Sequence, residues 1–161
     1  MTFILSSCNK KIELEKFDKD GKLIVYSQKV YTEISLKNQH LKVTVIDTFC
    51  INQKSRAIKD IKNGKLIYFG FGNYEFKKLS KKLSKYGIET KEHIASCIRI
   101  GSFKPYCYED EMLSEIHRKY GENFIDSICE VAKKEFVVEN PDIEYIENGN
   151  DLRNKYNTKI H

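Results

Sequence analysis

The chain has no tryptophan, only two prolines and only eight glycines among its 161 residues. So little proline and glycine excludes collagen-like and low-complexity chains. No apolar run approaches the roughly 18 residues of a membrane-spanning helix. Five cysteines are too few for a disulfide-dense miniprotein, whereas nine phenylalanines and ten tyrosines are too many for a disordered chain. The composition therefore indicates an ordinary folded core.

Arginine is also scarce, with four residues against 24 lysines, although the formal net charge is +5. Recognition of phosphate or guanine favours arginine, so this surplus is more typical of an AT-rich genome than of a nucleic-acid surface. The charged residues are distributed unevenly along the chain. Residues 1–100 hold 20 basic and 10 acidic groups, and residues 101–161 hold 8 and 13. The two halves either complement each other within one fold or leave two oppositely charged faces.

The first residues resemble the end of a bacterial lipoprotein leader. Leu5-Ser6-Ser7-Cys8 has the form of a lipobox, whose cysteine is acylated, and a polar tether follows it. Residues 1–7 lack the charged start and the 7–15 apolar residues of a signal peptide, so we expect Met1 to be internal to a longer leader. Acyl chains on Cys8 would hold the protein on a membrane surface. The alternative is a short first strand with an incidental buried cysteine.

Two hairpins are predicted in the first half of the chain. Asp20-Gly21 and Asn63-Gly64 supply the positive φ angles of a tight hairpin turn. The first turn would join strands over 12–17 and 22–31, and the second would join strands over 57–62 and 65–71. Between them, residues 41–45 alternate as a half-buried strand.

Three helices are predicted in the second half, at about 74–86, 108–120 and from 124 onward, each with an apolar face. A further strand is predicted at 136–138. The order of elements indicates an α+β fold in which about three helices pack on one face of a mainly antiparallel sheet. We expect a truncated leader and tether over 1–11, a single domain over 12–147 and a loosely ordered tail over 148–161.

The expected oxidation state of the cysteines depends on the cellular compartment of the protein. In an exported protein Cys97 and Cys107 flank a loop of nine residues and are the candidate disulfide. In the cytosol all five cysteines would be free thiols. Zinc bound by His93, Cys97, Cys107 and His117 is a weaker alternative, because the short C-x2-C spacing is missing. No metal or cofactor is expected.

Catalytic patterns are sparse. No serine lies in a G-x-S-x-G elbow, and a cysteine nucleophile with His93 or His117 as base is a pairing that most chains of this size offer. The acidic cluster of Glu109, Asp110, Glu111 and Glu115 could supply paired carboxylates or hold a divalent cation, but at the start of a helix it is interpreted as a solvated face. An enzyme is therefore the least favoured of three hypotheses.

The second hypothesis is a cytoplasmic protein that binds nucleic acid. Residues 67–74, with the sequence IYFGFGNY, partly resemble the base-stacking strand of an RNA-recognition motif. The following predicted helix presents a basic face made of Lys77, Lys78, Lys81, Lys82 and Lys85. The alternative is a lysine-coated solvent face.

Taken together, the lipobox-like start, the DGKLI hairpin and residues 85–128 resemble a family of small bacterial lipoproteins. The most specific pieces are Leu5–Cys8, the Cys97 and Cys107 pair, and the segments at 119–121 and 124–127. The hairpins also resemble MORN-type hairpins. The resemblance implies an envelope address and no particular activity. The leading hypothesis is a non-catalytic, lipid-anchored protein of the cell envelope that binds a protein partner, with an immunity-type role.

Overall fold

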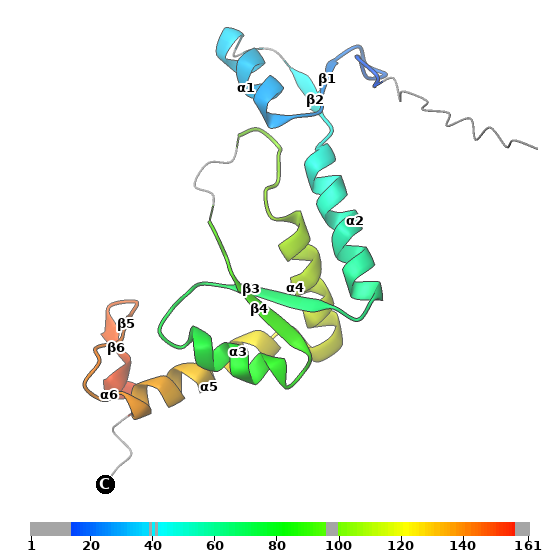
Figure 1. Cartoon of the computed structure of the whole chain (residues 1–161). Coiled ribbons are helices and arrows are strands. Elements are labelled where there is room, and N and C mark those ends of the chain that lie inside the picture. Colours follow the sequence, from blue (N-terminus) through cyan, green and yellow to red (C-terminus); the bar gives the residue numbers. More distant parts are fainter. Residues whose placement is uncertain (1–13, 39, 41, 96–99, 157–161) are drawn as a thin grey trace, which may run out of the picture. The chain divides into compact units, whose positions relative to one another are not determined.

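A computed structural model describes residues 14–38, 40, 42–95 and 100–156 (Figure 1). Its contacts divide the chain into two compact units, one made of Met1–Thr48 and Ile100–Phe103 and the other of Phe49–Arg99 and Lys104–His161. Over the described residues there are six helices and three two-stranded sheets, two of them parallel. The predicted fold, a mainly antiparallel sheet with about three helices, is therefore wrong. The class remains α+β.

The first unit contains a small β-α-β arrangement. Strand β1 (Leu23–Val25) pairs in parallel with β2 (Val43–Val45), and helix α1 (Gln28–Lys37) connects them. The hydroxyl of Ser27 caps the start of α1 by accepting a hydrogen bond from the Val30 amide at 3.4 Å.

The first predicted hairpin is reduced to a single antiparallel bridge between Phe17 and Leu23. The Asp18–Gly21 turn does form, with Gly21 at φ +75°. The chain beyond β1 then begins a helix at Gln28 instead of extending the strand, because Ser27 supplies an N-cap. Parallel pairing with β2 replaces the expected antiparallel partner.

The second predicted hairpin is a helix followed by a strand. Helix α2 (Thr48–Lys62) includes the residues expected to form the first strand, and Gly64 ends it at φ +79°. The Lys65 amide donates to the Asp60 carbonyl at 3.0 Å, which closes the end of the helix. Strand β3 (Leu66–Gly70) follows directly. Asn-Gly therefore serves as a helix stop here, a role that needs the same positive φ as a hairpin turn.

The second unit is built on a second parallel pair. Strand β3 pairs with β4 (Ile88–Glu92), and helix α3 (Phe76–Ser84) connects them. Helices α4 (Cys107–Tyr120) and α5 (Phe124–Glu139) follow, so the three predicted helices are present. The predicted strand at 136–138 lies inside α5.

Alternating residues of β3 contribute to two core clusters. Leu66 and Tyr68 pack with Leu83 of α3 and with Ile125 and Ala132 of α5. The neighbouring residues on the strand, Ile67 and Phe69, pack on the other side with Ala57 of α2 and with Tyr108 and Met112 of α4. Strand β3 is therefore covered on both faces, and what remains accessible near it is its edge and the loop that leaves its carboxyl end.

The end of the described chain is structured, although the sequence predicts a loose tail from residue 148. Strands β5 (Ile146–Glu147) and β6 (Asn150–Asp151) form a short hairpin, and helix α6 (Leu152–Tyr156) follows. Leu152 is buried with Tyr145 and Val137 in a third core cluster. That apolar contact attaches the segment to α5. None of the helices in the described part of the chain is long and apolar enough to cross a membrane.

Glu75, only 5% exposed, connects this C-terminal segment to the start of α3. The Tyr145 hydroxyl donates a hydrogen bond to Oε2 of Glu75. Burial, together with that hydrogen bond, raises the pKa of Tyr145 well above its ordinary value, so the phenol keeps its proton.

We expect Tyr145→Phe to lower the free energy of unfolding by about 2 kcal/mol, because it deprives a buried carboxylate of a hydrogen bond. Urea denaturation followed by circular dichroism measures the change. Tyr156→Phe is the matched control, since the Tyr156 hydroxyl donates to the exposed side chain of Glu130 at 2.8 Å and should contribute much less. Equal losses from both variants would contradict the assignment.

Candidate functional site

The carboxyl ends of β3 and β4 lie at the same edge of their sheet, because the strands are parallel. Open parallel sheets bind ligands at this edge. The loop Phe71–Glu75 leaves β3 there, and His93 follows β4, with its amide donating to the Gly70 carbonyl at 2.8 Å. The aromatic, glycine-containing segment singled out in the sequence therefore ends at a position suited to binding.

The two glycines of this segment allow close packing. A Cβ on Gly70 would lie 2.8 Å from the Tyr68 ring and 3.2 Å from that of Phe76. A Cβ on Gly72 would lie 3.2 Å from Oε1 of Glu92. The second glycine thus brings the loop backbone against the last residue of β4, which carries a carboxylate.

His93 is held between three side chains. Its Nδ1 lies 2.6 Å from Oε2 of Glu109 in the first turn of α4. The Phe71 ring packs edge-on against the imidazole at a centroid distance of 5.3 Å, and the Tyr106 ring lies at 4.6 Å. The sequence interpretation placed Glu109 on a solvated face, but its side chain is only about one quarter exposed because it turns inward to His93.

Two cavities border this cluster. One, of about 270 Å³, is lined mainly by aromatic side chains and by two carboxylates: Tyr68, Phe69, Phe71, His93, Tyr106, Glu109, Asp110 and Leu113. We call it the aromatic cavity. The other, of about 310 Å³, has the cations Arg56, Lys65 and Lys91 in its wall. Phe69, Tyr106 and Glu109 border both cavities.

Two of the three cations that line the second cavity have partners. The Arg56 guanidinium lies 4.6 Å from the centroid of the Tyr108 ring, and Nζ of Lys65 lies 3.8 Å from Oε2 of Glu89. The Tyr108 hydroxyl donates to Oδ2 of Asp60 at 2.6 Å. These contacts hold the side chains of the second cavity, which shares residues with the aromatic cavity, in fixed positions.

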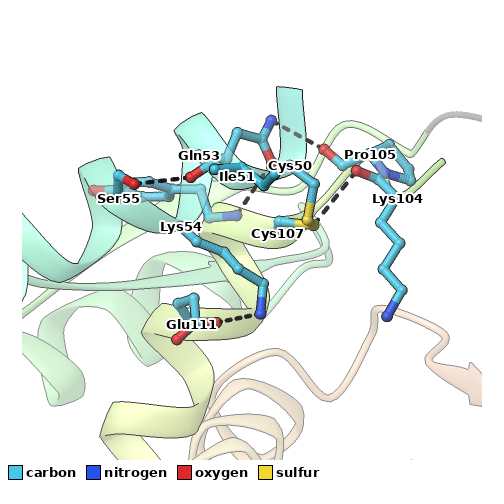
Figure 2. The surroundings of a disulfide bond; sticks show 10 residues. Cys50, Ile51, Gln53, Lys54, Ser55, Lys104, Pro105, Cys107 and Glu111 are labelled. Carbon is cyan, nitrogen blue, oxygen red and sulfur yellow. Dashed lines mark hydrogen bonds and ion pairs between the residues drawn. A yellow bond between two sulfur atoms is a disulfide. The ribbon is translucent and has the colours of Figure 1, made fainter. Parts of the chain in front are cut away.

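The first turn of α4 is fixed by a disulfide and by polar contacts (Figure 2). Cys107, the first residue of α4, is bonded to Cys50 near the start of α2, with a Cα–Cα distance of 5.3 Å. Nε2 of Gln53 donates to the Pro105 carbonyl at 3.1 Å, and Nζ of Lys54 lies 2.6 Å from Oε1 of Glu111. These contacts position Tyr106 and Glu109 beside His93.

This disulfide differs from the predicted one. Cys107 is bonded to Cys50 and not to Cys97, which lies outside the described residues, as does the predicted lipidation residue Cys8. The short loop between Cys97 and Cys107 favoured the wrong partner, because the sequence does not reveal that α2 brings Cys50 to the start of α4. The bond is fully shielded at Cys107 and nearly so at Cys50.

The candidate zinc ligands are not gathered into one site in the described part of the chain, where no group of three ligating side chains is found. His93 contacts Glu109, and Cys107 is in the disulfide. His117 lies in the last turn of α4.

The predicted basic face of α3 is partly neutralised. The Lys78 ammonium pairs with Glu139, and that of Lys82 pairs with Glu135, both on α5. The pKa of Glu135 is lowered, chiefly by its hydrogen bond from Lys82. Lys77, Lys81 and Lys85 are exposed. The five lysines thus divide between a helix-to-helix contact and the solvent.

Cys129 is the free cysteine of the described residues and is half-buried on α5. Burial raises the pKa of its thiol, and the nearby carboxylates of Asp126 and Glu75 act in the same direction, against Lys133. Burial also raises the pKa of Tyr68, its neighbour on β3, to about 12.

We expect iodoacetamide to modify Cys129 more slowly at pH 8 than an exposed cysteine, because the thiolate reacts and less of it is present. The rate should keep increasing above about pH 8.5, the ordinary thiol pKa. Peptide mass spectrometry of timed samples measures this rate. A rate that levels off below that pH would contradict the raised pKa.

Comparison of the chain with protein-family models, curated proteins and solved structures gives no match. The site is therefore interpreted from its own residues. Sequence reasoning identified segment 67–74 and named His93, but it missed the roles of Tyr106 and Glu109, the latter placed on a solvated face, and it missed the Cys50–Cys107 bond. A histidine just after one parallel strand, with an aromatic residue and acids at a following helix start, was the signal for the first two. This signal can be interpreted only when the two strands are known to be parallel.

Proposed function

We propose that this protein is anchored in the bacterial cell envelope through a lipid on Cys8 and acts by binding a protein partner. An immunity-type role, in which a small protein masks a toxin, fits this mode of action. The anchor is supported by the lipobox-like Leu5–Cys8 segment.

The binding role is carried by the exposed aromatic residues of the β3–α3 loop. Phe71 is 65% exposed and Tyr74 is 64% exposed. Tyr74 is held by stacking on Phe136 at a centroid distance of 5.5 Å, and Phe71 is held by His93. Rigid, exposed aromatic side chains have little conformational entropy to lose on association, and protein interfaces are enriched in them. This loop therefore has the properties of a contact surface for another protein.

The Cys50–Cys107 disulfide supports an address outside the cytosol. Disulfides persist in oxidising compartments, whereas cytosolic thiols are kept reduced. Both cysteines are shielded from solvent, so the bond has the character of a structural rather than a redox-active one.

The test uses the full chain with its natural upstream region, tagged at the carboxyl end and expressed in its native cells. Crosslinked membrane fractions from wild type, Phe71→Ala and Val138→Ala are compared by purification and mass spectrometry. Val138 is a matched control, because it is an exposed apolar residue on α5. We expect wild type and Val138→Ala to retain one partner in fixed stoichiometry. The amount of partner recovered with Phe71→Ala should be at least about tenfold lower.

The absence of a stoichiometric partner after crosslinking would overturn the binding role. The anchor is tested separately with an alkyne-labelled fatty acid. Label on wild type that is lost in Cys8→Ser supports the anchor, and an unmodified amino terminus on the native protein contradicts it.

A further inference from the structure

The aromatic cavity beside the exposed loop has a size that suits one side chain. Its volume is about 270 Å³, below the roughly 300–1,000 Å³ typical of pockets for drug-sized ligands. It lies directly next to Phe71, the residue proposed to contact the partner. A side chain projecting from the partner surface is therefore a more suitable occupant than a large free ligand.

The walls of this cavity favour a cation. Rings of Phe69, Phe71 and Tyr106 line it, and the faces of such rings carry the negative part of the aromatic quadrupole. The rings around His93 are tilted or edge-on to the imidazole, with interplanar angles of 78° for Phe71 and 59° for Tyr106. A cavity with several aromatic rings in its wall suits an ammonium or guanidinium group.

The carboxylates add net negative charge. Glu109 and Asp110 both line the cavity, and in the described part of the chain neither forms an ion pair with a lysine or arginine. The neighbouring acid Glu111 is the one that pairs with Lys54. Nδ1 of His93 lies 2.6 Å from Oε2 of Glu109, so the histidine holds this carboxylate in the cavity wall.

We infer that the aromatic cavity receives an arginine or lysine side chain of the protein partner. This inference rests on the proposed function and specifies it: the partner presents a basic residue, and Phe71, Tyr106, Glu109 and Asp110 bind that residue. The guanidinium or ammonium contacts the rings, and the carboxylates of Glu109 and Asp110 provide the counter-charge.

The cavity is tested with a probe that needs no knowledge of the partner. The ¹⁵N-labelled protein, with its disulfide intact, is titrated at low salt with acetyl-Gly-Arg-Gly-amide. The control peptide carries citrulline, which keeps the shape of arginine without its charge. We expect millimolar binding by the arginine peptide, at least about tenfold tighter than by the citrulline peptide. The shifted amides should cluster at Phe71, Gly72, His93 and Glu109.

Two variants localise the effect. Asp110→Asn should weaken binding of the arginine peptide severalfold, and Glu122→Gln, an exposed acid outside the cavity, should leave it unchanged. Spectra of the free variants show whether each is folded. Equal shifts with both peptides, shifts elsewhere on the protein, or equal effects of the two variants would overturn the inference.

Failure of this inference is distinguishable from failure of the proposed function. Loss of the partner in Phe71→Ala, with full retention in Asp110→Asn and no preference for arginine, would leave the binding role intact and exclude a basic side chain in the cavity. Conversely, absence of any stoichiometric partner would exclude the binding role, whatever the peptide shows.

Discussion

Replacing Cys50 and Cys107 together by alanine will lower the free energy of unfolding by about 4 kcal/mol. The bond joins residues 57 positions apart, so its removal releases a long loop in the unfolded chain, and the entropy model gives this magnitude. Domains are stable by only about 5–15 kcal/mol in total, which makes this a large loss. Urea denaturation of the oxidised protein and of the double variant, followed by circular dichroism, measures it.

A reducing agent provides the companion experiment. It should destabilise the wild-type protein by a similar amount and leave the double variant unchanged. Cys129→Ala serves as the matched control, because Cys129 is a free thiol and its replacement should not remove the response to reductant. Alkylation of Cys50 or Cys107 in the folded, unreduced protein would show that the bond is absent.

Ile116→Ala will lower the free energy of unfolding by about 2–5 kcal/mol. Ile116 has no exposed surface and packs in the core cluster that joins β3, β4, α3 and α5. Its truncation removes apolar contacts and leaves a cavity that neighbouring strands and helices cannot close fully. Urea denaturation followed by circular dichroism compares the variant with wild type.

Leu113→Ala is the control for this prediction. It lies on the same helix and loses a similar volume, but Leu113 is already 36% exposed. Truncating Leu113 should lower the free energy of unfolding clearly less than truncating Ile116. Equal costs would mean that α4 is not packed with Ile116 inward, which would also remove the support for the position of Glu109.

The helices of the second half were predictable because their signals are local. Periodic apolar residues predicted α3, α4 and α5. Gly121 caps the end of α4 at positive φ, and Gly87, also at positive φ, lies three residues beyond the end of α3. The predicted ends of these helices were less exact. The helix predicted from about residue 74 begins at Phe76 after Glu75, whose buried side chain accepts a hydrogen bond from Tyr145.

The sheets were not predictable from local signals. Asp20-Gly21 and Asn63-Gly64 require positive φ whether they turn a hairpin or end a helix, so their composition does not distinguish the two. The α2 segment was read as a strand before a turn, yet its buried Cys50 and Ala57 lie seven residues apart, a helical spacing. Parallel pairing depends on contacts across whole helices, which no short pattern contains.

The candidate site was predictable only in part, for the same reason. The aromatic loop 71–74 stood out in the sequence, but its neighbours come from β4 and α4. Glu109 at a helix start has the appearance of a residue that merely complements the helix dipole. Only the packing of α4 against β3 reveals that it faces His93.

The bond between Tyr145 and Glu75 has a consequence for the timing of biosynthesis. It links residues 70 positions apart, and Glu75 is the last residue of the loop that carries Phe71 and Tyr74. A chain still emerging from the ribosome lacks Tyr145, and with it the edge-to-face contact of that ring with Tyr74, until most of its length has been translated. The loop between β3 and α3 therefore gains its final support late in synthesis, after nearly all of the second unit has been translated.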